Sequence, residues 1–145
     1  MHTIESTENE IVEEFELFDD WADKYQFIIE IGQKLPPLDD RYKIDENRIR
    51  GCQSSVWLHA FNENGKIFFR SDSDSTFVKG EIALLIRVLS GRTAEEIIKT
   101  DLNFIDKIGL RQHLAITRAN GLASMIKQMK LYAVGFQSAN SNRFN

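Results

Sequence analysis

The sequence is poor in residues that make disulfides, kinks or metal sites. It has one cysteine, Cys52, together with two prolines and three histidines in 145 residues. One cysteine cannot form a disulfide within the chain, which fits a reducing compartment. The N-terminus has no basic segment followed by an apolar run, so we expect no secretion signal and a cytoplasmic location. No stretch approaches the roughly twenty apolar residues that span a bilayer, so we expect no membrane partner.

The scarcity of ligands and glycines also excludes several classes of site. A zinc or iron–sulfur site needs several Cys or His ligands at suitable spacing, and Cys52 and the three histidines lack such spacing. A phosphate-binding loop needs several glycines before a helix, and none is present. The net charge of −4 argues against non-specific binding to nucleic acid. We therefore expect no metal or cofactor in this chain, and a protein or small-molecule partner.

What is present predicts one domain rich in helices. A chain of 145 residues can bury roughly two thirds of the surface that its unfolded form exposes, which is enough for a core without disulfides. A capping box at Thr7 and Glu10 predicts a helix over 8–18, and Asp19 or Asp20 can cap a second helix that ends at Pro36 and Pro37.

Three further helical segments are predicted after the middle of the chain. Residues 77–89 are apolar nearly all round and predict a central buried helix. A capping box at Thr93 and Glu96 starts a short helix, and one more helical turn is expected within 101–113. Thr117 can cap a last helix, whose apolar stripe is typical of core packing.

A β-hairpin is predicted between the second helix and the central one. Residues 56–61 and 66–70 have strand composition, and Asn64 with Gly65 supplies the positive φ angles of a tight turn. The fold class is therefore α+β: a small antiparallel sheet, made of the hairpin plus a short strand at 47–49, packed against several helices. We expect a single domain over 1–136 and a disordered polar tail over 137–145.

Cys52 lies in a small, polar run between residues 47–49 and the first hairpin strand, so we expect it in a tight loop. One interpretation is a buried, inert cysteine, which is common for an unpaired thiol. The other is a reactive thiol, because Arg48 and Arg50 would lower its pKa. The hairpin also brings the loop near Asp72 and Asp74, which either cap the next helix or, for Asp74, face the cysteine loop or a docking partner.

A cysteine hydrolase or acyl transferase is an alternative, with His113 as the base for Cys52. Against it, a strand follows the cysteine, so no helix N-terminus activates the thiol or supplies amides to an oxyanion.

Six short motifs in this order resemble the SufE-type sulfur acceptor proteins of iron–sulfur cluster assembly. They are Arg-Gly-Cys-Gln-Ser-Ser-Val-Trp-Leu at 50–58, Asp-Ser-Asp at 72–74, Val-Lys-Gly at 78–80, Gln-His-Leu at 112–114, Thr-Arg at 117–118 and Gly-Leu at 121–122. The resemblance covers nearly the whole chain. Ser55 is a departure, since the family often has Gln there. The resemblance implies a fold similar to the U-type iron–sulfur scaffold proteins.

The resemblance also implies a function. A cysteine desulfurase would hold sulfur as a persulfide, and Cys52 would accept that sulfur, stimulate the desulfurase and relay the sulfur to a scaffold complex. Pyridoxal phosphate would belong to the desulfurase, so this chain would be an accessory protein and not itself an enzyme. The sequence leaves open which desulfurase is the partner and whether the protein is a monomer or a homodimer.

The same resemblance implies roles for the residues around the cysteine. The reactive loop would lie partly shielded in the free protein and swing out on docking, with Gly51 providing backbone freedom. Cys52 would form the persulfide, with Gly51, Gln53 and Ser54 in the reactive loop, and Arg118, Asp74, His113 and Arg50 as loop-holding or partner-facing residues. For Arg118, plain solvent exposure is the alternative.

Overall fold

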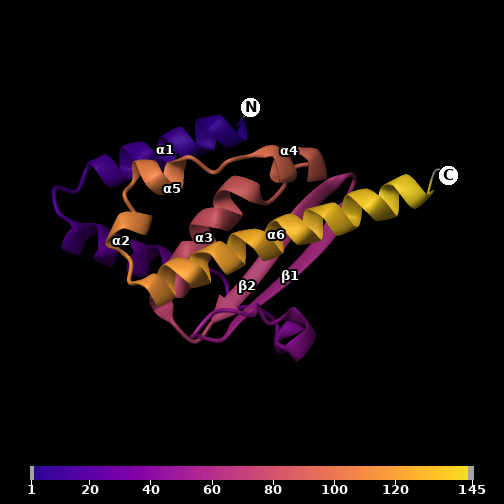
Figure 1. Cartoon of the computed structure of the whole chain (residues 1–145), viewed down its shortest axis with the longest axis horizontal. Coiled ribbons are helices and arrows are strands. Elements are labelled where there is room, and N and C mark those ends of the chain that lie inside the picture. Colours follow the sequence, from indigo (N-terminus) through magenta and orange to yellow (C-terminus); the bar gives the residue numbers. More distant parts are fainter. Residues whose placement is uncertain (1, 144–145) are drawn as a thin grey trace.

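A computed structural model describes residues 2–143, with side chains up to residue 139 in the last helix. The α+β class is confirmed, with helices on a two-stranded sheet (Figure 1). In chain order the elements are α1 (Ile4–Glu16), α2 (Trp21–Gln33), η1 (Asp40–Tyr42), η2 (Asp45–Asn47), β1 (Val56–Glu63), β2 (Lys66–Ser73), α3 (Thr76–Leu89), α4 (Ala94–Lys99), α5 (Phe104–Lys107), η3 (Arg111–His113) and α6 (Ile116–Arg143).

The hairpin has the predicted turn. Asn64 and Gly65 both have positive φ, at 55° and 81°, as the tight turn requires. The antiparallel register runs from Val56 opposite Ser73 to Glu63 opposite Lys66, so β2 extends three residues beyond the predicted strand. The short strand expected at 47–49 is reduced to one bridge, between Arg48 and Trp57.

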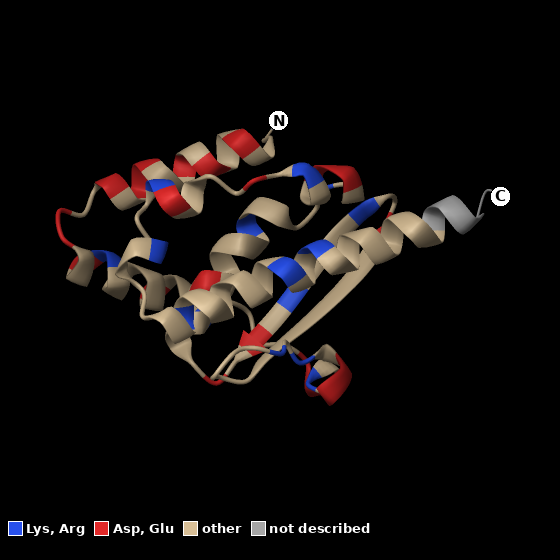
Figure 2. Cartoon of the chain, in the orientation of Figure 1, with Lys and Arg blue, Asp and Glu red and all other residues tan. Residues whose placement is uncertain are grey.

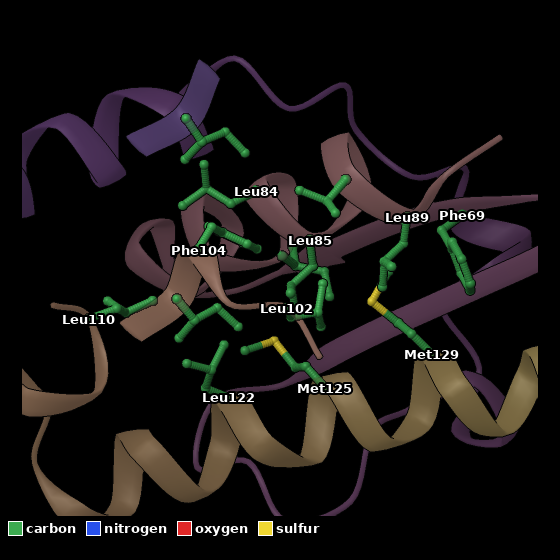
Figure 3. Packing of buried hydrophobic residues seen from close by; sticks show 14 of the residues in the cluster. Phe69, Leu84, Leu85, Leu89, Leu102, Phe104, Leu110, Leu122, Met125 and Met129 are labelled. Carbon is green, nitrogen blue, oxygen red and sulfur yellow. The ribbon is translucent and has the colours of Figure 1, made fainter. Parts of the chain in front are cut away.

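The core lies between the sheet, α3 and α6. Figure 1 shows α6 beginning beside the open end of the hairpin and running along it. Figure 3 shows Leu122, Met125 and Met129 of α6 pointing toward buried side chains of α3 and α5. All three are at most 1% exposed, so the stripe on the last helix is core packing, as the sequence predicts.

The start of α1 differs from the prediction. The helix begins at Ile4, and its capping box is formed by Thr3 and Ser6. Thr7, the predicted cap, is buried within the helix, where its hydroxyl accepts a hydrogen bond from Arg92. Glu10 instead forms an ion pair with Arg87 of α3. It is one of the acidic residues along α1 in Figure 2. Thr7 and Glu10 therefore make tertiary contacts and do not cap the helix.

The ends of the other helices agree only in part with the prediction from the sequence. Asp20 caps α2 and Thr93 with Glu96 forms a capping box at α4, as predicted, but α2 already ends at Gln33. At the last helix, α6 begins at Ile116, so Thr117 is its second residue and not its cap. The backbone is helical through Arg143, where the sequence predicts a disordered tail from 137, because extending an established helix is easier than nucleating one. Residues 144–145 of that tail lie outside the described residues.

Helices α2 and α3 meet backbone to backbone at two glycines. A Cβ on Gly80 would lie 2.0 Å from the carbonyl oxygen of Ile28, and one on Gly32 would lie 2.3 Å from that of Thr76. Real Cβ atoms do not approach so closely. Glycine is therefore required at both positions because of space, and the contact sets how deeply α3 lies against α2.

We predict that Gly80→Ala destabilises the protein by about 3 kcal/mol, because the added methyl group must separate the two backbones. Urea denaturation monitored by circular dichroism measures this loss. The matched control is Gly135→Ala on α6, where an added Cβ would meet nothing within 4 Å and should stabilise the helix by roughly 1 kcal/mol. Equal stability of the two variants would contradict the close contact.

Candidate functional site

The cysteine loop, residues 50–55, is closed by the hairpin at its first end. The backbone N–H of Ile49 donates to the carbonyl of Val56 at 2.8 Å, and Arg48 pairs with Trp57 across the same junction. Ile49 is buried and belongs to the hydrophobic core. The loop therefore leaves and re-enters the sheet at neighbouring points.

The second end of the loop is fixed to the end of β2. Asp74 Oδ1 accepts from the backbone N–H of Ser55 at 3.1 Å, and the Asp74 N–H donates to the Ser55 carbonyl at 3.3 Å. The Ser73 hydroxyl donates to the same carbonyl at 2.7 Å. Ser75, and not Asp74, caps α3. Of the two alternatives for Asp74, the structure has the one in which it faces the cysteine loop.

Asp72 does not cap α3 either. It lies within β2, is 5% exposed, and accepts from the backbone N–H of Leu38 at 3.2 Å. Its carboxylate also pairs with Lys43 at 3.2 Å and Lys79 at 3.1 Å. Burial acts to raise the pKa of Asp72, but hydrogen bonds from Ser73, both lysines and Leu38 outweigh it and lower the pKa. Asp72 thus links two parts of the chain to the sheet beside the loop: the segment after α2, through Leu38 and Lys43, and α3, through Lys79.

Gly51 brings the loop against α6. Its φ is +90°, a left-handed conformation that favours glycine. A Cβ at this position would also lie 2.5 Å from the hydroxyl oxygen of Ser124 on α6. The left-handed backbone therefore favours glycine directly before the cysteine, and an added Cβ would also force the Ser124 hydroxyl to move.

The Cys52 thiol is half-buried between the loop and α6. Its Sγ donates to the carbonyl of Gly121 at 3.5 Å, a weak hydrogen bond because a thiol is a poor donor. Beside it lies a cavity of about 90 Å³, which we call the cysteine cavity. Its lining residues come from the loop, α3 and α6: Cys52, Gln53, Ser54, Ser75, Val78, Glu81, Thr117, Arg118, Gly121, Leu122 and Met125.

The electrostatics of Cys52 oppose the prediction made from its neighbours in sequence. Burial raises the pKa of the thiol, and the negative charge of Glu81 raises it further. The predicted lowering of the pKa by Arg48 and Arg50 is wrong, because both side chains are exposed to solvent, which screens their charges. In this conformation Cys52 is therefore a protonated thiol at neutral pH.

Glu81 of α3 is a site residue that the sequence analysis missed. It is 2% exposed, and its Oε2 has no hydrogen-bond partner among the described residues. Burial raises its pKa to about 8, against a weaker lowering by the charge of Arg118. The only signal in the sequence is that Glu81 is the one carboxylate in this largely apolar helix, directly after Gly80.

Arg118 is exposed but held in place. Its Nη1 donates to the Tyr25 hydroxyl at 2.7 Å, and the guanidinium lies over the rings of Phe77 and Tyr25, at 4.9 and 5.8 Å from their centroids. It lines the cysteine cavity and links α6 to α2 and α3. The alternative that Arg118 is simply solvated is therefore wrong, because its guanidinium contacts Tyr25 and Phe77.

His113 lies apart from the cysteine. Its ring stacks on Trp21 at 4.3 Å, and its Nδ1 lies 2.8 Å from the carbonyl oxygen of Gly109. It does not line the cysteine cavity. The structure therefore does not bring together the Cys52–His113 pair that a hydrolase would need.

In residues 2–143, no three His, Cys, Asp or Glu side chains are grouped so that they could hold a metal ion. Within the same range, no helix has the length and apolar character needed to cross a membrane.

Comparisons with known proteins agree on one family. The SufE family, described as an Fe–S metabolism associated domain, matches residues 9–133. An uncharacterised SufE-like protein of Rhizobium meliloti is 39% identical over 132 residues, which cover 88% of this chain and 94% of that protein. One from Synechocystis is 39% identical over 131 residues, covering 90% of this chain and 82% of the relative.

Two further relatives widen the comparison. The chloroplastic/mitochondrial SufE-like protein 1 of Arabidopsis thaliana is 40% identical over 126 residues, covering 86% of this chain but 34% of the plant protein. The solution structure of a hypothetical protein from Thermus thermophilus has a TM-score of 0.74 at 21% identity, covering 91% of this chain and 96% of that one. At that identity the solved structure supports the fold alone.

The buried Glu81 generates a prediction for stability against pH. Its pKa is about 8 in the folded protein and near the ordinary 4.5 in the unfolded chain, so the folded state retains a proton between these values. The free energy of unfolding therefore falls as pH rises from 4.5 to 8, by at most ~1.4 kcal/mol per pH unit. Glu81→Gln removes this loss, because the amide does not titrate.

Urea denaturation at intervals from pH 5 to 8 measures the difference between Glu81→Gln and the natural protein, which should grow steadily with pH. Glu63→Gln, at the exposed end of the hairpin, is the matched control and should show a constant difference. A constant difference for Glu81→Gln as well would show that Glu81 is ionised in the folded protein.

Proposed function

The chain belongs to the SufE family, and from this premise we propose that it accepts sulfur from a cysteine desulfurase as a persulfide on Cys52. In this proposal it stimulates the desulfurase and relays the sulfur to an iron–sulfur cluster assembly scaffold. The observation that carries the proposal is the placement of the chain's one cysteine. Cys52 lies in a loop tied at both ends, beside a cavity with space next to its sulfur.

The transfer is a thiol–disulfide exchange. The Cys52 thiolate attacks the outer sulfur of the partner's persulfide, R–S–SH; a new S–S bond forms, the old one breaks and R–S⁻ leaves. The leaving thiolate takes up a proton equal to the one that Cys52 lost. The sum is Cys52–SH + R–S–SH → Cys52–S–SH + R–SH, with no net oxidation. Pyridoxal phosphate acts in the desulfurase when it forms R–S–SH, so this step needs no cofactor in the present chain.

The structure supports a resting state that docking must change. Inside the cavity, burial keeps Cys52 protonated, and the thiolate is the form that attacks. Moving the sulfur out of the cavity into water or onto a partner removes the desolvation that raises its pKa. The weak bond to Gly121 opposes this movement little. Activation of the thiol and its presentation to the partner are thus one movement.

We predict that the natural protein strongly stimulates sulfide release from L-cysteine by a competent desulfurase, whereas Cys52→Ser still docks but does not stimulate. Intact mass should show a gain of about 32 Da, one sulfur atom, on the natural protein alone. Thermal melting of Cys52→Ser controls for folding. The absence of both stimulation and mass gain with an active desulfurase would overturn the proposed function.

Asp74 allows a separate test of loop holding. Asp74→Ala removes the acceptor for the Ser55 N–H, so the loop should open more often and Cys52 should react with iodoacetamide roughly fivefold faster in the free protein. The control is Asp19→Ala, at an exposed position between α1 and α2. An unchanged rate for Asp74→Ala would show that this hydrogen bond does not limit exposure of the thiol.

A further inference from the structure

Glu81 presents a buried oxygen atom that the protein itself leaves unpartnered. The side chain is 2% exposed, and its Oε2 finds no hydrogen-bond partner among the described residues. A polar group in this position destabilises a fold, since burial removes its hydrogen bonds to water. Such a group in a natural structure calls for an explanation, and an unfilled ligand position is one.

A ligand that accepts a hydrogen bond from Glu81 Oε2 would lie in the cysteine cavity. Glu81 and Cys52 line this same space, and the charge of Glu81 acts on the thiol. The cavity measures about 90 Å³, several times the space that one water-sized atom needs. It therefore has room for one more sulfur atom bonded to Cys52 Sγ.

Building on the proposed function, we propose that Glu81, as a neutral carboxylic acid, donates a hydrogen bond from Oε2 to the outer sulfur of a persulfide on Cys52. Glu81 is then the residue that retains transferred sulfur inside the free protein. Arg118, which lines the same cavity, adds a positive charge that favours the anionic sulfur.

The protonation states fit this assignment. A persulfide loses its proton more readily than a thiol, so the outer sulfur in Cys52–S–S⁻ is an acceptor that carries a negative charge. A carboxylate would repel it and has no proton to donate, whereas a carboxylic acid attracts it. Burial gives Glu81 a pKa of about 8, so the acid form prevails at neutral pH. The sign follows: sulfur is retained while Glu81 is protonated and exposed once Glu81 ionises, and the neighbouring anionic sulfur raises the pKa of Glu81 further.

Among the side chains in and around the cysteine cavity, Glu81 is the one expected to change protonation near pH 8. The loop contributes Cys52, which carries the persulfide, and α6 contributes the guanidinium of Arg118. Tyr25 of α2 reaches the site through Arg118, and Lys79 of α3 is paired with Asp72. A rise in reactivity at or above pH 8 that is absent from Glu81→Gln would therefore report on Glu81.

The test measures how fast the outer sulfur is alkylated. Cys52 is loaded with inorganic polysulfide, so that no desulfurase is needed: Cys52–S⁻ + HS–SH → Cys52–S–SH + HS⁻. The loaded protein then reacts with iodoacetamide between pH 6.5 and 9, and intact mass follows the product. Iodoacetamide does not titrate in this range, and Glu81→Gln reports any titration of the persulfide itself, so the difference between the two proteins reports on how Glu81 controls access to the sulfur.

We expect the natural protein to react about tenfold faster at pH 9 than at pH 7, the order expected for losing one hydrogen bond to a charged group. Glu81→Gln should stay slow throughout, because its amide donates at every pH. Glu81→Leu, which removes the donor, should be fast throughout. The exposed control Glu63→Gln should follow the natural protein.

Two results would overturn the assignment of Glu81: a rate that does not depend on pH in the natural protein, or the same rise with pH in Glu81→Gln. Both leave the proposed function standing, since the protein has then been loaded. Failure of Cys52 to take up sulfur from either polysulfide or a desulfurase would instead overturn the proposed function, and this assignment with it.

Discussion

Where α2 and α3 cross, the backbone at Gly80 lies against the carbonyl group of Ile28 with no side chain between them. This contact sets the depth and rotation of α3, and other parts of the site follow from it. Glu81, the next residue, is turned by about 100° around the helix and lines the cysteine cavity. Tyr25 of α2 meets Arg118 of α6 at the same end of the domain. A wider separation of α2 and α3 would move all of these groups.

The cysteine loop combines firm ends with a weakly held centre. Normal hydrogen bonds from Ile49 and Ser55 fix the two ends to the hairpin, whereas the Cys52 sulfur has one weak hydrogen bond, to Gly121. Inside the cavity, burial disfavours charge on both Cys52 and Glu81. The resting site is thus neutral at its two acidic groups, and a small movement of the sulfur changes its protonation. Such a site suits a group that is shielded between two transfers.

Features carried by neighbouring residues could be predicted well. The hairpin follows from alternating strand residues around Asn64 and Gly65, whose positive φ angles need no tertiary support. Asp20 and the pair Thr93 and Glu96 cap their helices as predicted, since a capping side chain bonds within its own turn. The capping box predicted at Thr7 failed because Arg92 and Arg87, far along the chain, engage its members.

The sequence by itself determined the α+β class, the hairpin and the identity of the one cysteine. Tertiary structure decided what surrounds that cysteine, because desolvation depends on segments that are distant in sequence. Arg48 and Arg50 are neighbours of Cys52 in the chain but stay in solvent, whereas Glu81 and Gly121 come from α3 and α6. The raised pKa values of Cys52 and Glu81 arise from burial between these elements. The spacing of residues along the chain does not indicate which of them will be buried, so the raised pKa values could not be predicted before the helices were seen to pack together.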